Sequence, residues 1–227
     1  MMTEAQKELW HTFEKIVEDK LLNAPGCHDY AHTLRVLHNA ELLLQTESNV
    51  QNPFAVRVAA LFHDFARPEE LASNGKKDHA QLGAELVRAE LEKLNCTPPF
   101  VDLVCDCVRT HRYRGKDLPQ TPEAKIVYDA DKLDSTGAFG IARAFHFAGR
   151  IGACLHNSAE DAVNSDSYSK NDSAYREYLV KLRYLPQKML TASGKKIAEE
   201  RGAFMEEFFE RLNREAGAAP PQHSAAR

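Results

Sequence analysis

The 227-residue sequence lacks the features that mark secreted, membrane-spanning and strongly basic proteins. It contains no apolar run near the roughly 18 residues that a transmembrane helix needs. Its N-terminal stretch, MMTEAQKELWHTFEKIVEDK, is charged throughout and unlike a signal peptide. The formal net charge is −4, so no overall positive field attracts a nucleic-acid polymer or an anionic membrane. We therefore expect a cytoplasmic protein that binds neither.

A disulfide framework is also not indicated, because the cysteines are few, odd in number and scattered. The five cysteines stand at positions 27, 96, 105, 107 and 154. Such a set fits free thiols in a reducing compartment better than paired ones. Cys105 and Cys107 are too close together for a usual zinc pair, so we interpret them as core thiols on a helix.

Sustained strand alternation is missing as well, and nearly every long segment has the periodicity of an amphipathic helix. The expected helices cover residues 4–22, 29–46, 53–64, 78–94, 98–111, 174–190 and 194–214. A further helix begins at Thr121-Pro122-Glu123, a capping residue followed by proline and an acid, and carries AKIVYDADKLDSTGAFGIARAF. We predict an all-α helical bundle forming one domain over residues 1–215, with a disordered tail at 216–227.

Two long polar segments separate these helices, at residues 66–78 and 154–172. Long polar loops in compact domains are often lids or mobile segments. A plain surface excursion is an equal alternative for each.

The chemistry of the sequence centres on the adjacent pair His63-Asp64, which follows a run of apolar helix formers. An aspartate at the end of an apolar helix needs a partner, because a buried charge is costly unless it is paired or bound to metal. His32 lies upstream and Asp131 downstream, in the acidic stretch DADKLD. Together they form a mixed nitrogen and oxygen set suited to a divalent metal that activates water. A structural histidine and a solvated acidic face are the alternatives for His32 and Asp131 taken singly.

Three further histidines extend this set. His79 opens one expected helix and His111 closes another, and each alone would be a structural or surface residue. Beside the four ligands they become candidates for a second metal or for general acid/base work. His28, four residues before His32, is a candidate for substrate contact or for support of a ligand. The spacing His28-x-x-x-His32 superficially resembles a zinc-protease helix, but the glutamate base is absent.

Several cations accompany these residues, which favours a phosphorylated substrate through charge pairing and bidentate contacts. Arg35, Arg112 and Lys132 are the candidate substrate-binding cations. A solvated charged face is the alternative for each of them. The other nearby cations are Lys76, Lys77, Arg109, Arg114 and Lys116.

At these residues the chain resembles the HD-domain phosphohydrolase superfamily, whose signature is His…His-Asp…Asp. The segments HDYAHTLRVLHNA, AALFHDFARPEE and KIVYDADKLDSTGAFGIARAF are similar to the small bacterial HD proteins of the YedJ/YpgQ-like subfamily. The C-terminal stretch from EYLVKLRYLPQKML to FFERLNRE is similar too, so the resemblance covers about residues 20–215.

The resemblance implies an HD-domain helical bundle with additional C-terminal helices, and it implies that His32, His63, Asp64 and Asp131 are metal ligands. Members of this subfamily include manganese-dependent enzymes that split nucleoside triphosphates into monophosphate and pyrophosphate. HD-type hydrolases of the alarmone ppGpp carry a Glu-Asp pair shortly after His-Asp, where this chain has Arg67 and Pro68. This difference argues against alarmone hydrolysis.

We therefore expect a metal-dependent hydrolase with Asp64 as its catalytic residue and a small nucleotide as its substrate. Mn²⁺ is the first expectation for the metal, with Mg²⁺, Co²⁺, Ni²⁺, Fe²⁺ and Zn²⁺ as alternatives. Nucleotide pyrophosphohydrolysis is the leading hypothesis, and a phosphomonoesterase or phosphodiesterase on the same site is the second. A metal- and nucleotide-binding sensor with little turnover is the alternative of another class. A homo-oligomer is compatible with the sequence.

Overall fold

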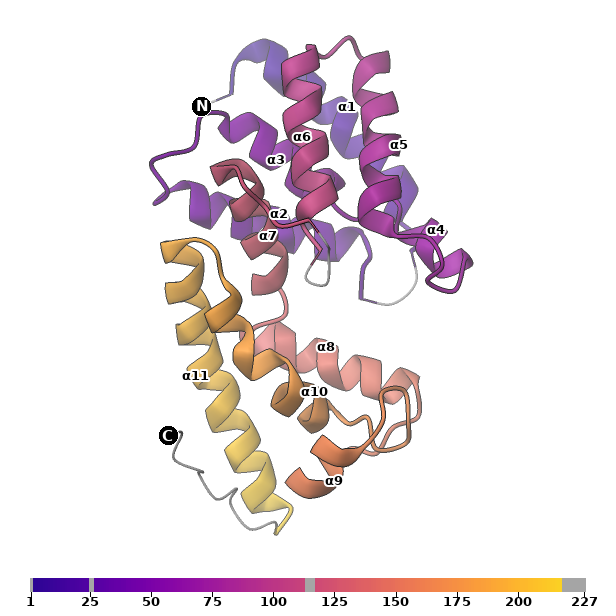
Figure 1. The fold of residues 1–227 in the computed structure, drawn as a ribbon, viewed down its shortest axis with the longest axis vertical. Coiled ribbons are helices and arrows are strands. Elements are labelled where there is room, and N and C mark those ends of the chain that lie inside the picture. Colours follow the sequence, from indigo (N-terminus) through magenta and orange to yellow (C-terminus); the bar gives the residue numbers. More distant parts are fainter. Residues whose placement is uncertain (1, 25–26, 113–116, 218–227) are drawn as a thin grey trace. The chain divides into compact units, whose positions relative to one another are not determined.

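The computed structural model describes residues 2–24, 27–112 and 117–217, and these residues contain helices and no strand (Figure 1). The prediction of an all-α fold is therefore confirmed. The chain divides into two compact units, one of Met1–Asp134 with Met189–Gly194 and one of Ser135–Lys188 with Lys195–Arg227. The expectation of one domain stays a prediction, and the expected tail lies outside the described residues from position 218 onward.

The first unit is built around a central helix. Its helices are α1 Glu4–Leu21, α2 Tyr30–Leu44, α3 Pro53–Phe62, α4 Arg67–Ala72, α5 His79–Lys93, α6 Pro98–Thr110 and α7 Pro122–Leu133. Helix α3 contacts α1, α2, α6 and α7, and eight of its ten residues are buried. A helix that is apolar on most of its surface belongs in the interior of a domain, and Arg57 is the one charged residue of α3. Because α3 ends at Phe62, the following pair His63-Asp64 also lies in the interior, where both side chains are buried.

The second unit has an aromatic core. Its helical segments are α8 Gly137–Arg150, α9 Ala159–Asn164, α10 Ala174–Val180, the 3-10 helix Leu182–Lys188 and α11 Ala192–Glu215, which begins within residues of the first unit. Helix α10 contacts α8, α9 and the 3-10 helix. The rings of Tyr178 and Phe209 stack with centroids 4.5 Å apart, so α11 packs on α10 through this pair.

The structure differs from the sequence prediction in four segments. The segments 66–78 and 154–172 contain the short helices α4 and α9. The helix expected from residue 121 through residue 145 divides into α7 and α8, because Gly137 has a φ of +63°, outside the right-handed helical region. The helix expected at 174–190 divides into α10 and the 3-10 helix, since the backbone of Lys181 leaves the helical conformation and Pro186 has no N–H to donate.

Two further features of the described residues concern the cysteines and the lengths of the apolar helices. All five cysteines lie in the described part of the chain and are free thiols, with Cys105 and Cys107 buried on α6. Among the described helices, none is both long enough and apolar enough to cross a membrane.

Candidate metal centre

The first turn of α2 holds His32 in a fixed orientation. Asp29 caps this helix, and its carboxylate accepts the backbone N–H of His32 at 2.9 Å. The His32 side chain is fully buried, and its Nδ1 bonds with Asp134 Oδ2 at 2.7 Å. An ionised carboxylate can only accept, so the ring carries its proton on Nδ1 and has an electron pair on Nε2.

The same kind of local hydrogen bond fixes the rings of His63 and His111, each at the end of a different helix. His63 is the C-cap of α3 and His111 is the C-cap of α6. His63 Nδ1 donates to the Ala60 carbonyl oxygen at 2.8 Å, and His111 Nδ1 donates to the Val108 carbonyl oxygen at 2.6 Å. In each case the acceptor lies three residues earlier, in the last turn of the helix. Both rings therefore also keep an electron pair on Nε2.

His79 is the first residue of α5 and completes a group of four buried imidazoles. Its Nδ1 lies 2.9 Å from Glu70 Oε2, within hydrogen-bond distance of that carboxylate. Arg67 Nη1 lies 3.1 Å from the same nitrogen, also within hydrogen-bond distance, and donates to Glu70 Oε2.

The four Nε2 atoms face one another in two pairs. His32 Nε2 lies 3.2 Å from His63 Nε2, and His79 Nε2 lies 3.2 Å from His111 Nε2. Burial lowers the pKa of His63 to about 3 against the opposing effect of Asp64, and burial also lowers the pKa of His111. Neutral imidazoles that direct electron pairs at each other repel unless a cation lies between them.

The Asp64 carboxylate lies between the two pairs. Its Oδ2 is 3.6 Å from the Nε2 atoms of both His32 and His63. Its Oδ1 is 3.3 Å from His79 Nε2 and 3.8 Å from His111 Nε2. Burial alone would raise the pKa of Asp64, but the positive charge of Arg67, together with the neighbouring imidazoles of His63, His28 and His111, outweighs it and holds the pKa well below its usual range. One ionised carboxylate thus contacts both pairs.

The three acids of the DADKLD stretch have separate roles. Asp131 Oδ1 lies 3.5 Å from His32 Nε2 and 3.9 Å from His63 Nε2, on the side of the first pair. Asp134 holds His32, as described above. Asp129 points elsewhere and accepts the backbone N–H groups of Leu190 and Thr191. Separate partners explain how three acids occupy six residues without mutual repulsion.

Three sets of residues are suited to hold a metal ion, because in each set the donor atoms lie within 4.8 Å of one another. They are His32 with His63 and Asp131, Asp64 with His79 and His111, and His28 with His32 and Asp64. The structure therefore brings together the six residues for which the sequence suggested one metal or two, and it adds His28 at their edge.

The four residues expected to bind substrate all have protein partners. His28 precedes α2, and its Nδ1 lies 2.8 Å from Asp64 Oδ2. Arg35 donates to Asp134 from Nε at 2.7 Å. Arg112 Nη1 donates to Asp78 Oδ2 at 2.5 Å. Lys132 is buried and donates to the carbonyl oxygen of His111 and, at 3.2 Å, to Asp131. Of the other cations, Arg114 and Lys116 lie outside the described residues.

Sequence reasoning missed three supporting residues: Arg67, Glu70 and Asp134. Arg67 contacts His28, Asp64 and Glu70 at the edge of the cluster. Arg67 and Glu70 belong to α4, whose start was readable from Pro68 and two acids in the first turn. Asp134 had no comparable signal, because its partner His32 is 102 positions away in the sequence.

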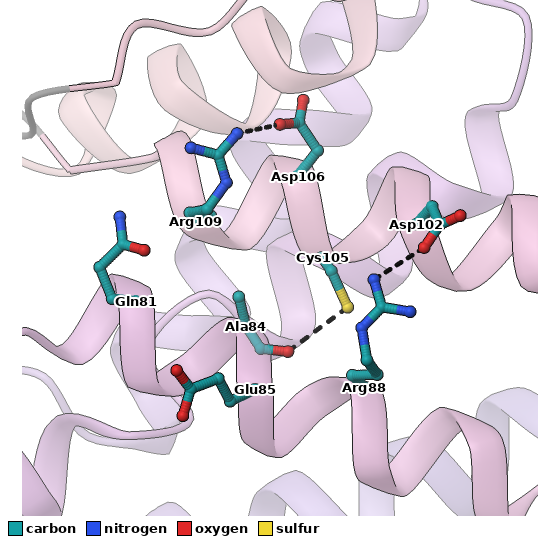
Figure 2. A pocket seen from close by; sticks show the side chains of 8 residues that line it. All are labelled: Gln81, Ala84, Glu85, Arg88, Asp102, Cys105, Asp106 and Arg109. Atoms are coloured by element: carbon teal, nitrogen blue, oxygen red, sulfur yellow. Dashed lines mark hydrogen bonds and ion pairs between the residues drawn. The ribbon is translucent and has the colours of Figure 1, made fainter.

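A separate hollow lies on the surface between α5 and α6 (Figure 2). Its lining includes the ion pairs Arg88–Asp102 and Arg109–Asp106 and the thiol of Cys105, which donates to the carbonyl of Ala84. None of the six metal-ligand candidates lines it. Four of its five charged residues are paired with one another, and Glu85 is the fifth.

Known proteins share this fold and this arrangement of segments. The family model for the HD domain matches residues 29–136, which include all six metal-ligand candidates. The protein YpgQ of Bacillus subtilis strain 168 is 32% identical over 203 residues, covering 88% of this chain and 89% of that protein. The chain belongs to the HD-domain family.

Solved structures agree with this assignment. The HD-domain protein resembles B. subtilis YpgQ in complex with ADP with a TM-score of 0.69 and 29% identity, covering 92% of this chain and 96% of that one. It resembles an HD-superfamily hydrolase from Bacillus thuringiensis with a TM-score of 0.71 and 28% identity, covering 94% and 100%. The HD-domain protein is thus a hydrolase and, in general terms, a metal-dependent phosphohydrolase.

Proposed function

We propose that the HD-domain protein hydrolyses nucleoside triphosphates to monophosphate and pyrophosphate, using a divalent metal held by the histidine and aspartate cluster. The observation that carries the proposal is the pair of facing imidazoles on each side of Asp64, with Nε2 atoms 3.2 Å apart in both pairs. The ADP bound to the related YpgQ supports a nucleotide as the substrate.

The donor atoms fit a divalent ion. We assign His32, His63, Asp64 and Asp131 to one ion and Asp64, His79 and His111 to a second. Imidazole nitrogen with carboxylate oxygen suits Mn²⁺, and also Fe²⁺, Co²⁺, Ni²⁺ or Zn²⁺, whereas Mg²⁺ prefers oxygen alone. A bound ion of this kind lowers the pKa of its water and polarises a phosphoryl oxygen. Acceptors at the Nδ1 atoms of His32, His63 and His111 already leave the Nε2 atoms of these three rings available for coordination.

The protein residues have distinct parts in this reaction. Water adds to the α-phosphorus, and the bond from that phosphorus to the oxygen bridging to the β-phosphate breaks. Asp64 stays ionised, so it is able to accept a hydrogen bond from the attacking water and orient it. His79 and His111 face Asp64 and each other, which favours ion binding over proton transfer for this pair.

Cations at the edge of the cluster would offset the negative charge of the phosphates. Arg67 is the partly exposed cation beside Asp64, and the imidazole of His28 lies next to it as a polar group, with 17% and 30% of their side chains exposed. Arg112 Nη2 lies 3.4 Å from Oε1 of Glu70, and Glu70 also pairs with Arg67. Lys132 and Arg35 are held by Asp131 and Asp134, which supports roles in positioning those acids. Substrate contact by Arg35 and Lys132 stays a prediction.

Product analysis tests the reaction. The full-length protein is incubated with a panel of nucleoside triphosphates, nucleotides and phosphomonoesters, each with Mn²⁺, Mg²⁺, Co²⁺ or Ni²⁺. We expect equal amounts of monophosphate and pyrophosphate from a triphosphate. Free phosphate from a monophosphate, or opening of a diester, would replace this proposal with a phosphomonoesterase or phosphodiesterase. An absence of turnover across the panel would favour a nucleotide sensor.

A further inference from the structure

Two carboxylates outside the ligand set hold one imidazole of each facing pair. Asp134 holds His32, and Glu70 holds His79. The other member of each pair, His63 or His111, is held by a backbone carbonyl instead. Each pair therefore combines one ring fixed by the main chain with one ring fixed by a carboxylate. The second kind of ring depends on a side chain that mutation can change.

We propose that Asp134 and Glu70 are positioning residues, each of which sets the tautomer of one histidine and thereby the ion affinity of one half of the centre. The inference rests on the proposed function, because it assigns each carboxylate to one of the two ions. Asp134 serves the half containing His32, His63 and Asp131. Glu70 serves the half containing His79 and His111.

Asp134 contacts the ligand His32 directly. Its side chain is 2% exposed, so water does not compete for its oxygens. Oδ2 accepts from His32 Nδ1 at 2.7 Å, and Arg35 donates to both oxygens, from Nε to Oδ1 at 2.7 Å and from Nη2 to Oδ2 at 3.2 Å. The carboxylate is thus held both by the guanidinium of Arg35 and by the imidazole of His32.

Glu70 repeats this arrangement in the other half. Its side chain is 9% exposed, and Oε2 lies 2.9 Å from His79 Nδ1. Arg67 donates to the same oxygen, and Arg112 Nη2 lies 3.4 Å from Oε1. Arg67 Nη1 also lies 3.1 Å from His79 Nδ1, so the arginine, the carboxylate and the imidazole all contact one another.

The tautomer matters because only a deprotonated imidazole nitrogen binds a metal. A carboxylate accepts and never donates when ionised, so it keeps the proton on Nδ1 and leaves Nε2 free for the ion. An amide in its place carries an NH₂ group. If that group faces the histidine, it donates to Nδ1 and moves the ring proton to Nε2, which then no longer binds a metal. If it faces the arginine, two donors oppose each other.

The test uses Asp134→Asn and Glu70→Gln, which change one atom and keep the shape of each side chain. Zn²⁺ is titrated into the full chain while long-range ¹H–¹⁵N spectra follow the ring nitrogens of the four histidines. We expect Asp134→Asn to weaken zinc binding at His32 and His63 by about 10- to 100-fold, with His79 and His111 responding as in the wild type. Glu70→Gln should give the reverse result.

Two matched controls are available in the chain. Asp129 lies on α7 with Asp134 and is buried, but it bonds with Leu190 and Thr191 away from the cluster. Glu69 precedes Glu70 on α4 and pairs with Lys20. Asp129→Asn and Glu69→Gln should leave the zinc response of all four histidines unchanged, even where Asp129→Asn lowers the stability of the fold.

The same spectra of metal-free protein separate this inference from the proposed function. In the wild type, His32 and His79 should be protonated on Nδ1, and each variant should move the proton in its own histidine only. Unchanged tautomers, or equal loss of zinc from both halves in either variant, would overturn the positioning roles. If the wild type shows the expected tautomers but binds no ion and turns over no substrate, the proposed function fails while the roles in setting the tautomer stand.

Discussion

The interiors of the two compact units differ in kind. The first unit buries a connected set of histidines, acids and cations among its apolar residues, including His32, His63, Asp64, Lys132 and Asp134. The second unit fills its interior with stacked rings, among them Tyr175, Tyr178 and Phe209. Burying polar groups costs free energy even when they are paired, whereas burying rings lowers the free energy of the fold. The comparison indicates that the first interior is arranged for chemistry and the second for stability.

The largest expected effect is the loss of turnover in Asp64→Ala. This change removes the carboxylate that contacts both histidine pairs, so turnover should fall by roughly 10³-fold or more, on the scale seen when a group central to the chemistry is removed. The far-ultraviolet circular dichroism spectrum should stay helical, because no helix depends on this side chain for its cap. Turnover near the wild-type level would contradict the catalytic role of Asp64.

Phe209→Ala should give the opposite result. Phe209 is 1% exposed and contacts the rings of Tyr175, Tyr178 and Phe145. Its truncation should lower the free energy of unfolding by about 3–5 kcal/mol, measured by urea denaturation. Turnover per folded molecule should stay unchanged. A selective loss of turnover with full stability would mean that the second unit also serves the chemistry.

Tyr178 gives the aromatic core a dependence on alkaline pH. Burial, with the nearby charges of Glu206 and Glu210, raises the pKa of Tyr178 to about 12 from 10.0. Between these values the unfolded chain loses the proton and the folded chain keeps it, so the free energy of unfolding falls by at most about 1.4 kcal/mol per pH unit. Urea denaturation from pH 9 to 11.5 should show a smaller fall for Tyr178→Phe. Parallel curves for both proteins would contradict the assignment.

The smallest effect is expected on the surface of the first unit. Arg88 and Asp102 pair across the hollow between α5 and α6, with 43% and 66% of their side chains exposed (Figure 2). Exposed pairs contribute about 0.2–1 kcal/mol, so Asp102→Asn should lower the free energy of unfolding by about 0.5 kcal/mol and leave turnover unchanged. A large loss of turnover would indicate that this hollow takes part in the reaction.

The site residues that could be predicted from the sequence are those marked by a local sequence pattern. His63-Asp64 was readable because it follows an apolar helix, and His79 and His111 because each stands at a helix end. The helical class followed from periodicity over long segments. Short helices such as α4 escaped because six residues give little more than one turn of periodicity.

Asp134, the missed residue without a local signal, depends on a distant part of the chain. The contact between Asp134 and His32 joins α2 to the end of α7, across 102 positions. The division between α7 and α8 that places Asp134 at a helix end follows from the positive φ of Gly137 and the close packing of Gly140 against the Ser135 carbonyl. Such contacts arise from the packing of distant segments, so no local sequence pattern predicts them.

The most direct measurement of the central claim is the position of Mn²⁺ in a crystal of the full chain, located by anomalous X-ray scattering. We predict one peak among His32, His63 and Asp131 and a second between His79 and His111, with Asp64 contacting both. With Mn²⁺ in excess, an absence of peaks at the two Nε2 pairs, or a peak only at another place in the molecule, would contradict this prediction.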